Sequence, residues 1–246
     1  MPITAPDYSR YFTDGTTFVC GRDMTGTLSV VHVGELALST GQVVACDPFV
    51  YLGTGDVEPF TVAVEPGRYA VDAAVATLVR PGAEPGPHPH TRVAAVRLRI
   101  RDVEVTGWEL ALLPGEDPAE LGEEQYFGYD VDAGTGCFYD ASAEHAFPGT
   151  QDEEGVVWAA MESVGYGPGV FMAQGEDGHN LAGFTSGWGD GSYPTWIGRA
   201  ADGSVACFLT DFFVVPHEGE TGAGAESGAE TGSGAETGSG AEVRAS

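Results

Sequence analysis

Three aspartates and a cysteine lie close together in residues 129–140, which read YDVDAGTGCFYD. If residues 129–133 are extended, Asp130 and Asp132 project to the same side of the chain. Two neighbouring carboxylates raise each other's pKa and can share a proton for general acid–base chemistry, or share a cation for Lewis-acid chemistry. We therefore take Asp130, Asp132, Asp140 and Cys137 as candidate catalytic residues.

A second stretch of similar composition, SGWGDGSYP, occupies residues 186–194. Loops rich in glycine, aromatic residues and aspartate often present functional side chains at the rim of a sheet. Asp190 joins the candidate catalytic set, and Trp188 with Tyr193 is a candidate aromatic wall for a small ligand. Asp47, just after a predicted strand, is a further candidate ligand-binding residue. This hypothesis of a shared site requires both stretches to meet at one pocket.

Each of these residues also has a structural interpretation. The aspartates are equally suited to Asx turns that cap backbone amides, and Trp188 and Tyr193 to packing under a glycine loop. Cys137 is either a loop nucleophile, with His145 as its base, or a buried structural thiol. The stretch lacks the third oxygen donor and distal Glu of an EF-hand loop. We assign no metal ligands, and the cofactor is unknown.

The charge of the chain is strongly one-sided. Asp and Glu number 37 against 10 Lys and Arg, all of them Arg, which gives a formal net charge of −27. Such a charge repels phosphate backbones and anionic lipids, so it disfavours nucleic-acid and membrane binding. It favours solubility in general, or a basic protein partner or cation in particular.

Compartment is inferred from the cysteines and from the apolar runs. The four cysteines, Cys20, Cys46, Cys137 and Cys207, are widely spaced without a CxxC pair, which indicates free thiols in a reducing compartment. No signal peptide is visible, and no apolar run approaches the roughly 20 residues of a membrane span. We expect a cytoplasmic protein.

Hydrophobic patterning predicts a mainly β fold. One helix is expected at residues 151–163, with acidic residues at its start, and a hairpin is expected from strands 28–38 and 42–46 around a turn at 39–41. Further strands are predicted at residues 60–64, 69–79, 93–101, 103–113, 170–173, 181–185, 195–198 and 205–215, the last two joined by an Asp-Gly turn.

These elements predict a β-rich α+β domain, an antiparallel sandwich or curled barrel with one or two short helices. It spans residues 1–216 and is followed by a disordered acidic tail, residues 217–246, rich in Gly, Ala, Glu, Thr and Ser. Arg97, Arg99 and Arg101 share one face of a predicted strand. They either pair with acidic cross-strand neighbours or form an anion-facing patch.

Three segments carry a family resemblance: residues 38–48 (LSTGQVVACDP), 131–140 (VDAGTGCFYD) and 186–199 (SGWGDGSYPTWIGR) continued by 206–212 (ACFLTDF). Together with residues 66–71 (PGRYAV), they resemble the bacterial family named domain of unknown function 4241, over roughly residues 26–213. The resemblance implies an intracellular bacterial β-rich domain, and it brings no activity or catalytic residue with it.

Three functions are compatible with these features. The first is a binding module of the immunity-protein type, whose acidic surface meets a basic protein; no complete catalytic motif is present, and acidic complementarity favours fast, salt-sensitive association. The second is a small-molecule hydrolase that uses the aspartate cluster with or without a divalent cation. A third, weaker possibility is a sugar- or nucleotide-binding domain using Trp188, Tyr193 and the arginine strand.

Overall fold

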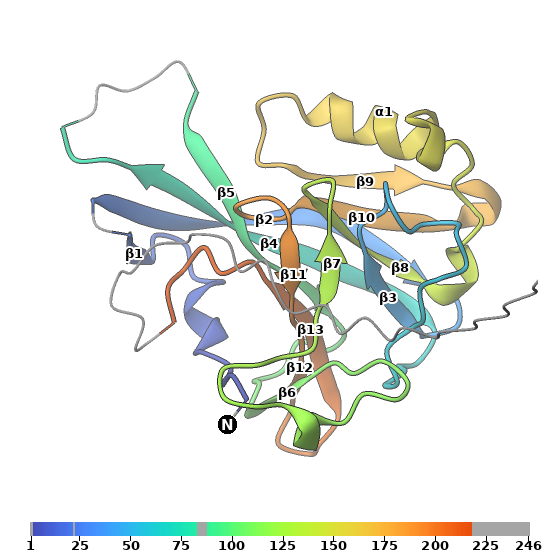
Figure 1. Ribbon diagram of the computed structural model, residues 1–246, viewed down its shortest axis with the longest axis horizontal. Helices are drawn as coiled ribbons and strands as arrows, with labels where there is room; N and C mark the ends of the chain where they lie inside the picture. Colours follow the sequence, from blue (N-terminus) through green and yellow to red (C-terminus); the bar gives the residue numbers. More distant parts are fainter. Residues whose placement is uncertain (1, 22, 83–87, 218–246) are drawn as a thin grey trace, which may run out of the picture.

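The structure is a computed structural model that describes residues 2–21, 23–82 and 88–217. Its largest element is a strongly curled antiparallel sheet of seven strands, ordered β1-β2-β4-β5-β13-β12-β6 (Figure 1). In that order the strands are β1 (Thr17–Cys20), β2 (Met24–Leu38), β4 (Gly67–Val79), β5 (His90–Arg99), β13 (Val205–Asp211), β12 (Thr195–Arg199) and β6 (Gly107–Leu110).

A second antiparallel sheet has four strands, ordered β3-β8-β10-β9. These are β3 (Val43–Cys46), β8 (Thr135–Asp140), β10 (Asn180–Thr185) and β9 (Val170–Gln174). The helix α1 (Gly155–Val164) lies beside β9 at the edge of the molecule (Figure 1). Strands β7 (Tyr129–Val131) and β11 (Gly191–Tyr193) pair as a separate ribbon. Short 3-10 turns are η1 (Tyr8–Arg10), η2 (Pro118–Glu120), η3 (Ala141–Ala143), η4 (Thr150–Asp152) and η5 (Glu176–Gly178).

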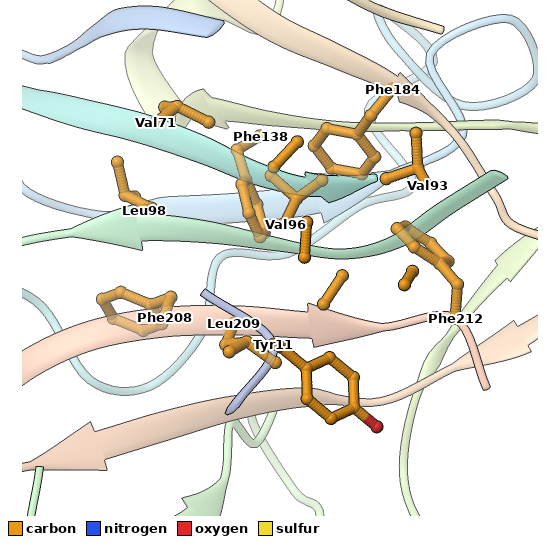
Figure 2. Packing of buried hydrophobic residues seen from close by; sticks show 14 of the residues in the cluster. Tyr11, Val71, Val93, Val96, Leu98, Phe138, Phe184, Phe208, Leu209 and Phe212 are labelled. Carbon is orange, nitrogen blue, oxygen red and sulfur yellow. The ribbon is translucent and has the colours of Figure 1, made fainter. Parts of the chain in front are cut away.

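The main core lies between the two sheets. Phe138 of β8 and Phe184 of β10 pack edge to face, with centroids 5.2 Å apart, and Phe212 lies 5.7 Å from Phe184. Val96 and Leu98 face them from β5 (Figure 2). All five side chains are fully buried. Each buried side chain of this size stabilises the fold by about 1.5–3 kcal/mol before entropy is counted. The β-rich α+β class predicted from the sequence is confirmed.

The opposite face of the large sheet is covered by the N-terminal segment. Figure 2 shows Tyr11 and Leu209 on the side of β13 away from Phe212. Tyr8, in η1, packs edge-on against Trp108 at 4.9 Å and donates a hydrogen bond to the buried carboxylate of Asp211 at 2.9 Å. Because both faces of β13 are covered, this strand is buried along its whole length, in line with its apolar sequence.

The predicted hairpin of residues 28–46 is wrong. Strand β2 pairs with β4, and β3 pairs with β8 in the other sheet. The intervening turn does not close onto itself, because the backbone amides of Thr40 and Gly41 are bound by the carboxylate of Asp140. Asn180 joins the sheets a second time, since its side chain accepts from the Ala37 amide and donates to the Glu35 carbonyl.

Other local predictions also differ from the structure. Within the predicted strand 103–113, only Gly107–Leu110 form a strand, β6. The helix begins at Gly155, four residues later than predicted, because Gly149 and Glu153 have left-handed φ values of 84° and 57° around the short turn η4. Residues 60–64 are irregular and not a strand, although Phe60 donates to the Val43 carbonyl at the edge of β3. The hairpin of β12 and β13 is confirmed.

The arginines of the β5 region pair with carboxylates. Arg97 and Arg99 both reach Asp72 of the neighbouring strand β4, at 3.2 and 3.6 Å, and Arg101 reaches Asp202 at 3.1 Å. The cross-strand interpretation therefore describes this face.

Among the described residues, no helix has the length and apolarity needed to cross a bilayer. His217, which we placed at the start of the tail, contacts Asp211 at 2.8 Å. The rest of the predicted tail lies outside the described residues, as do residues 83–87 of the loop that follows β4.

Candidate functional site

The two candidate stretches are adjacent in the structure, although 45 residues, 141–185, lie between them in the chain. Tyr129 of β7 pairs with Tyr193 of β11, and Asp130 pairs with Ser192 (Figure 1). Beyond the ribbon, the Ser186 amide donates to the Gly134 carbonyl at 3.0 Å, and the Gly134 amide donates to the Asp190 carboxylate at 3.1 Å. The glycine-rich turns of both stretches are therefore held against each other.

The buried carboxylate of Asp47 holds the turn at residues 132–134 in place. Its carboxylate accepts from the backbone amides of Asp132 at 3.1 Å and Ala133 at 2.6 Å through one oxygen, and from Phe49 at 2.9 Å through the other. The side chain is fully buried. Burial raises the pKa of Asp47 and the negative charge of Asp132 raises it further, whereas the three amide hydrogen bonds lower it and only partly offset the rise. Asp47 is thus a backbone clamp and not an exposed ligand.

The side chains of Asp130, Asp132 and Asp190, on the paired strands β7 and β11 and their adjoining turns, are exposed to solvent. We call the strands β7 and β11, with these three carboxylates, the acidic ribbon. Tyr51 lies beside it, and its pKa is raised by burial and then by the carboxylates of Asp132, Asp130 and Asp47. Asp130 and Asp132 are exposed whereas Val131 between them is buried, so the two carboxylates face the same side, as the alternation of an extended chain predicts.

The acidic ribbon contains no preformed metal site. Within the described ranges, no three His, Cys, Asp or Glu side chains are placed to hold a metal ion together. The Asp190 carboxylate is already engaged by the Gly134 amide. The arrangement is therefore suited to attracting a positively charged group at the surface, where solvated carboxylates keep their charge.

The two aromatic candidates have different surroundings. Trp188 is partly exposed, and the Arg92 guanidinium of β5 lies 5.5 Å from its ring centroid, in cation–π contact. Tyr193 is buried, and its hydroxyl lies 2.7 Å from the Gly189 carbonyl and 3.1 Å from the Ser186 carbonyl. Burial raises the pKa of Tyr193 to about 12. Tyr193 thus closes the turn that presents Trp188, and only Trp188 is available to a ligand.

Asp140 lies apart from the acidic ribbon, at the opposite end of β8. Its buried carboxylate accepts from the Thr40 amide and hydroxyl at 2.9 Å each, and from the Gly41 amide at 3.2 Å. Its other oxygen accepts from the amide and hydroxyl of Ser142. With five donors satisfied by one carboxylate, Asp140 joins the β2–β3 turn to the end of β8.

Cys137 lies in the middle of β8, not in a loop as we predicted. Its thiol is fully buried and contacts the thiol of Cys46, with 3.9 Å between the sulfurs. Burial, together with this contact, raises the pKa of Cys137 well above its ordinary value, which disfavours the nucleophilic thiolate. His145 is exposed in the turn after η3, so the two residues occupy different environments.

Sequence reasoning missed two buried carboxylates and one tyrosine. Asp72 is 6% exposed between His32, Arg97 and Arg99. Asp211 is fully buried and accepts from Tyr8, and from the amide of Phe213 at 3.0 Å. A polar residue within an apolar strand, such as Asp211 in residues 205–215, was an available signal. Tyr51 had none, because its neighbours come from distant segments.

Two cavities are lined by none of the exposed residues Asp130, Asp132, Trp188 and Asp190. The larger, about 350 Å³, is at the β6 edge and is lined mainly by apolar residues, among them Ile3, Val62, Leu110 and Trp196. The smaller, about 20 Å³, lies beneath Tyr129 and is large enough for about one water molecule. The two stretches therefore converge, and neither of these two cavities opens between their exposed side chains.

Comparison with known proteins places the chain in a family. No curated protein matches it significantly, and neither does any solved structure. The family model described as "Protein of unknown function (DUF4241)" matches residues 36–210, which run from the last residues of β2 into β13 and include both halves of the acidic ribbon. The chain therefore belongs to the DUF4241 family.

Proposed function

We propose that this protein is a cytoplasmic binding module, of the immunity-protein type, for a basic protein partner. The proposal rests on the convergence of Asp130, Asp132 and Asp190 on one ribbon. The turn of this ribbon is held by hydrogen bonds to the buried carboxylate of Asp47. In the described part of the chain, none of these three exposed carboxylates forms an ion pair. They are available to an incoming cation.

The electrostatic setting strengthens this surface. The net charge of −27 gives a long-range attraction for a basic protein, which raises the association rate at low salt. Trp188 supplies an aromatic contact next to the carboxylates, and aromatic residues are frequent anchors at interfaces. The four cysteines are all free and buried, which supports a reducing compartment such as the bacterial cytoplasm.

The test is binding to a labelled arginine-rich peptide and to a set of small basic proteins, measured by fluorescence anisotropy. We expect binding that weakens about tenfold or more between about 50 mM and about 300 mM NaCl. The combined variant Asp130→Asn, Asp132→Asn, Asp190→Asn should weaken binding by a similar factor, because it removes three negative charges from the acidic ribbon. The turns should stay intact, because each Asn keeps a side-chain oxygen that can accept backbone amides.

A matched control removes three exposed acidic charges elsewhere, with Asp152→Asn, Glu153→Gln and Glu154→Gln before α1. This control should change affinity by less than about twofold, since it removes the same net charge from residues that are not part of the acidic ribbon. Salt-independent binding, or equal losses in both variants, would contradict a specific acidic surface.

The second candidate, a small-molecule hydrolase, is favoured by one observation. Asp130 and Asp132 share a side with Tyr51, so a potential acid–base group lies beside two carboxylates. The test is hydrolysis of chromogenic esters and phosphates with and without Mg²⁺ or Ca²⁺. Turnover that Asp132→Asn abolishes without unfolding would establish this function in place of the binding module.

A further inference from the structure

Cys46 and Cys137 form a pair of thiols in direct contact across two neighbouring strands. Cys46 is the last residue of β3, and the antiparallel register places it opposite Cys137 of β8. The sulfurs are 3.9 Å apart, and both cysteines are free, with exposed fractions of 2% and 0%. The proposed binding function makes no use of this pair.

The backbone geometry at this position suits a disulfide. Residues directly opposite in an antiparallel pair have Cα atoms about 4.5 or 5.5 Å apart, depending on the hydrogen-bonding pattern. Both distances fall within the range of about 4.4–6.8 Å found for disulfides. Bond formation requires the sulfurs to approach to about 2.05 Å, which side-chain rotation can supply without moving the strands apart.

The same two strands hold the acidic ribbon. Asp47, which clamps the amides of Asp132 and Ala133, directly follows Cys46 in the chain. On the other strand, Gly134, whose amide binds Asp190, precedes Cys137 by three residues. A bond between Cys46 and Cys137 would therefore tie the clamp to the turn that it holds.

We propose that Cys46 and Cys137 form a reversible disulfide that locks the Asp47 clamp onto the 132–134 turn. The oxidant is a small-molecule disulfide of the glutathione class. The deprotonated sulfur of Cys46 attacks one sulfur of that molecule, which forms a mixed disulfide and releases one small thiol. Cys137 then loses its proton and attacks the Cys46 sulfur, which forms the protein disulfide and releases the second small thiol.

The order of these steps follows from the sheet. Strand β3 is at the edge of the four-stranded sheet, whereas β8 lies between β3 and β10. Opening of the short edge strand exposes Cys46 before Cys137, so the first exchange takes place at Cys46. The reaction is slow in the closed structure, because a buried thiol at raised pKa is a weak nucleophile.

The remaining two cysteines serve as internal controls. Cys20 in β1 lies opposite Met24, and Cys207 in β13 lies opposite Gly198 and Arg99. Neither faces another cysteine across a strand. Specific oxidation should therefore consume two of the four thiols and leave Cys20 and Cys207 reduced.

The experiment refolds the full chain from urea into glutathione buffers that range from fully reduced to fully oxidised, so that closed-state access does not limit the reaction. Free thiols are then blocked, and the protein is digested with trypsin. Cleavage after Arg22, Arg68, Arg101 and Arg199 places each cysteine in its own peptide. We expect one linked pair, the Cys46 and Cys137 peptides, with the loss of two hydrogen atoms.

Oxidation should also raise Tm by several degrees, on the order of 5–10 °C, because the bond closes a long loop in the unfolded chain. Hydrogen exchange at the amides of Asp132 and Ala133 should slow at least about tenfold. Adding a dithiol reductant should reverse both changes, and Cys46→Ser should abolish them while Cys20→Ser does not.

Three results would overturn the proposal. One is four free thiols in the most oxidising buffer, and another is a linked pair that contains Cys20 or Cys207. The third is a Cys46–Cys137 bond that leaves exchange at Asp132 and Ala133 unchanged, which would show a crosslink without the lock.

Discussion

Asp132 and Asp140 lie in the same short stretch and have opposite surroundings. Asp132 is exposed, its carboxylate interacts with the Tyr51 hydroxyl, and its backbone amide donates to Asp47. Asp140 is fully buried, and its carboxylate accepts from five donors in Thr40, Gly41 and Ser142. Identical side chains thus divide into a surface charge and an internal connector, because their strand ends face different neighbours.

Asp140→Ala should destabilise the fold strongly. The substitution leaves the buried amide of Gly41 and the partly buried amides of Thr40 and Ser142 without an acceptor, and we expect the free energy of unfolding to fall by about 3–5 kcal/mol. Urea unfolding followed by circular dichroism measures this. Asp152→Ala, at an exposed site, should cost less than about 0.5 kcal/mol. Equal small costs would mean that the β2–β3 turn is held by other contacts.

Asp47 should make a contribution to stability that falls as the pH rises. Burial raises its pKa in the folded state, so between about 3.9, the unfolded value, and the raised folded value the native state binds more protons than the unfolded chain. Stability from Asp47 is therefore highest below this window and is lost as the pH rises through it.

The measurement compares wild type with Asp47→Asn by urea unfolding from pH 4 to pH 7. We expect the stability of the wild type relative to the variant to be greater at the acidic end, where Asp47 is protonated. If it is instead greater at pH 7, the amide hydrogen bonds of Phe49, Asp132 and Ala133 outweigh desolvation, and the pKa of Asp47 is lowered.

Among the elements, the acidic ribbon depends on two turns that bring it against the end of the sheet. Gly187 in the second turn has a left-handed φ of 56°, and a Cβ there would lie 2.8 Å from the Cβ of Phe212. Gly203, in the β12–β13 hairpin, also has a left-handed φ, 80°, but a Cβ there meets nothing within 4 Å. A substitution at Gly203 therefore tests backbone strain alone, whereas one at Gly187 tests strain together with overpacking.

Gly203→Ala should cost about 1 kcal/mol through strain alone, and Gly187→Ala about 2–4 kcal/mol through strain and overpacking together. Thermal unfolding of both variants tests the difference. Gly187→Ala should also weaken any binding that depends on Trp188, because the turn must shift. Equal costs would indicate that Phe212 relaxes freely around the added methyl group.

The sequence predicted most strands, because their patterns are local. The β12–β13 hairpin follows from an Asp-Gly turn between apolar runs, and β5 follows from the alternation in the second half of residues 93–101. The false hairpin of residues 28–46 had an equally good local pattern. It failed because Asp140, about a hundred residues later, binds the turn and directs β3 to the second sheet.

The stretches that form the candidate site could be predicted from the sequence, but the role of each side chain in them could be predicted less well. Composition identified both stretches that form the acidic ribbon, since glycine, aspartate and aromatic residues gather there. Which aspartates are exposed depends on long-range contacts, such as those of Asp47 with Asp132 and Ala133. The burial of Cys137 depends on β3 and β10 flanking β8, which no local pattern encodes.

At the scale of the whole molecule, one-sided charge opposes folding. With a net charge of −27, repulsion among carboxylates favours expanded states. Local ion pairs such as Arg97–Asp72 and Arg199–Glu109 counter this only where an arginine is present, and the chain has ten. Solution conditions that screen charge should therefore stabilise the protein.

Raising NaCl from about 20 mM to about 500 mM shortens the Debye length from roughly 20 Å to roughly 4 Å, which removes most long-range repulsion. We expect Tm, measured by calorimetry, to rise by a few degrees. A variant that neutralises exposed charges in the loop before β7, Glu120→Gln with Glu123→Gln and Glu124→Gln, should start from a higher Tm at low salt and gain less from added salt. A Tm that falls with salt would contradict this expectation, because it would mean that the ion pairs stabilise the fold by more than the repulsion among carboxylates destabilises it.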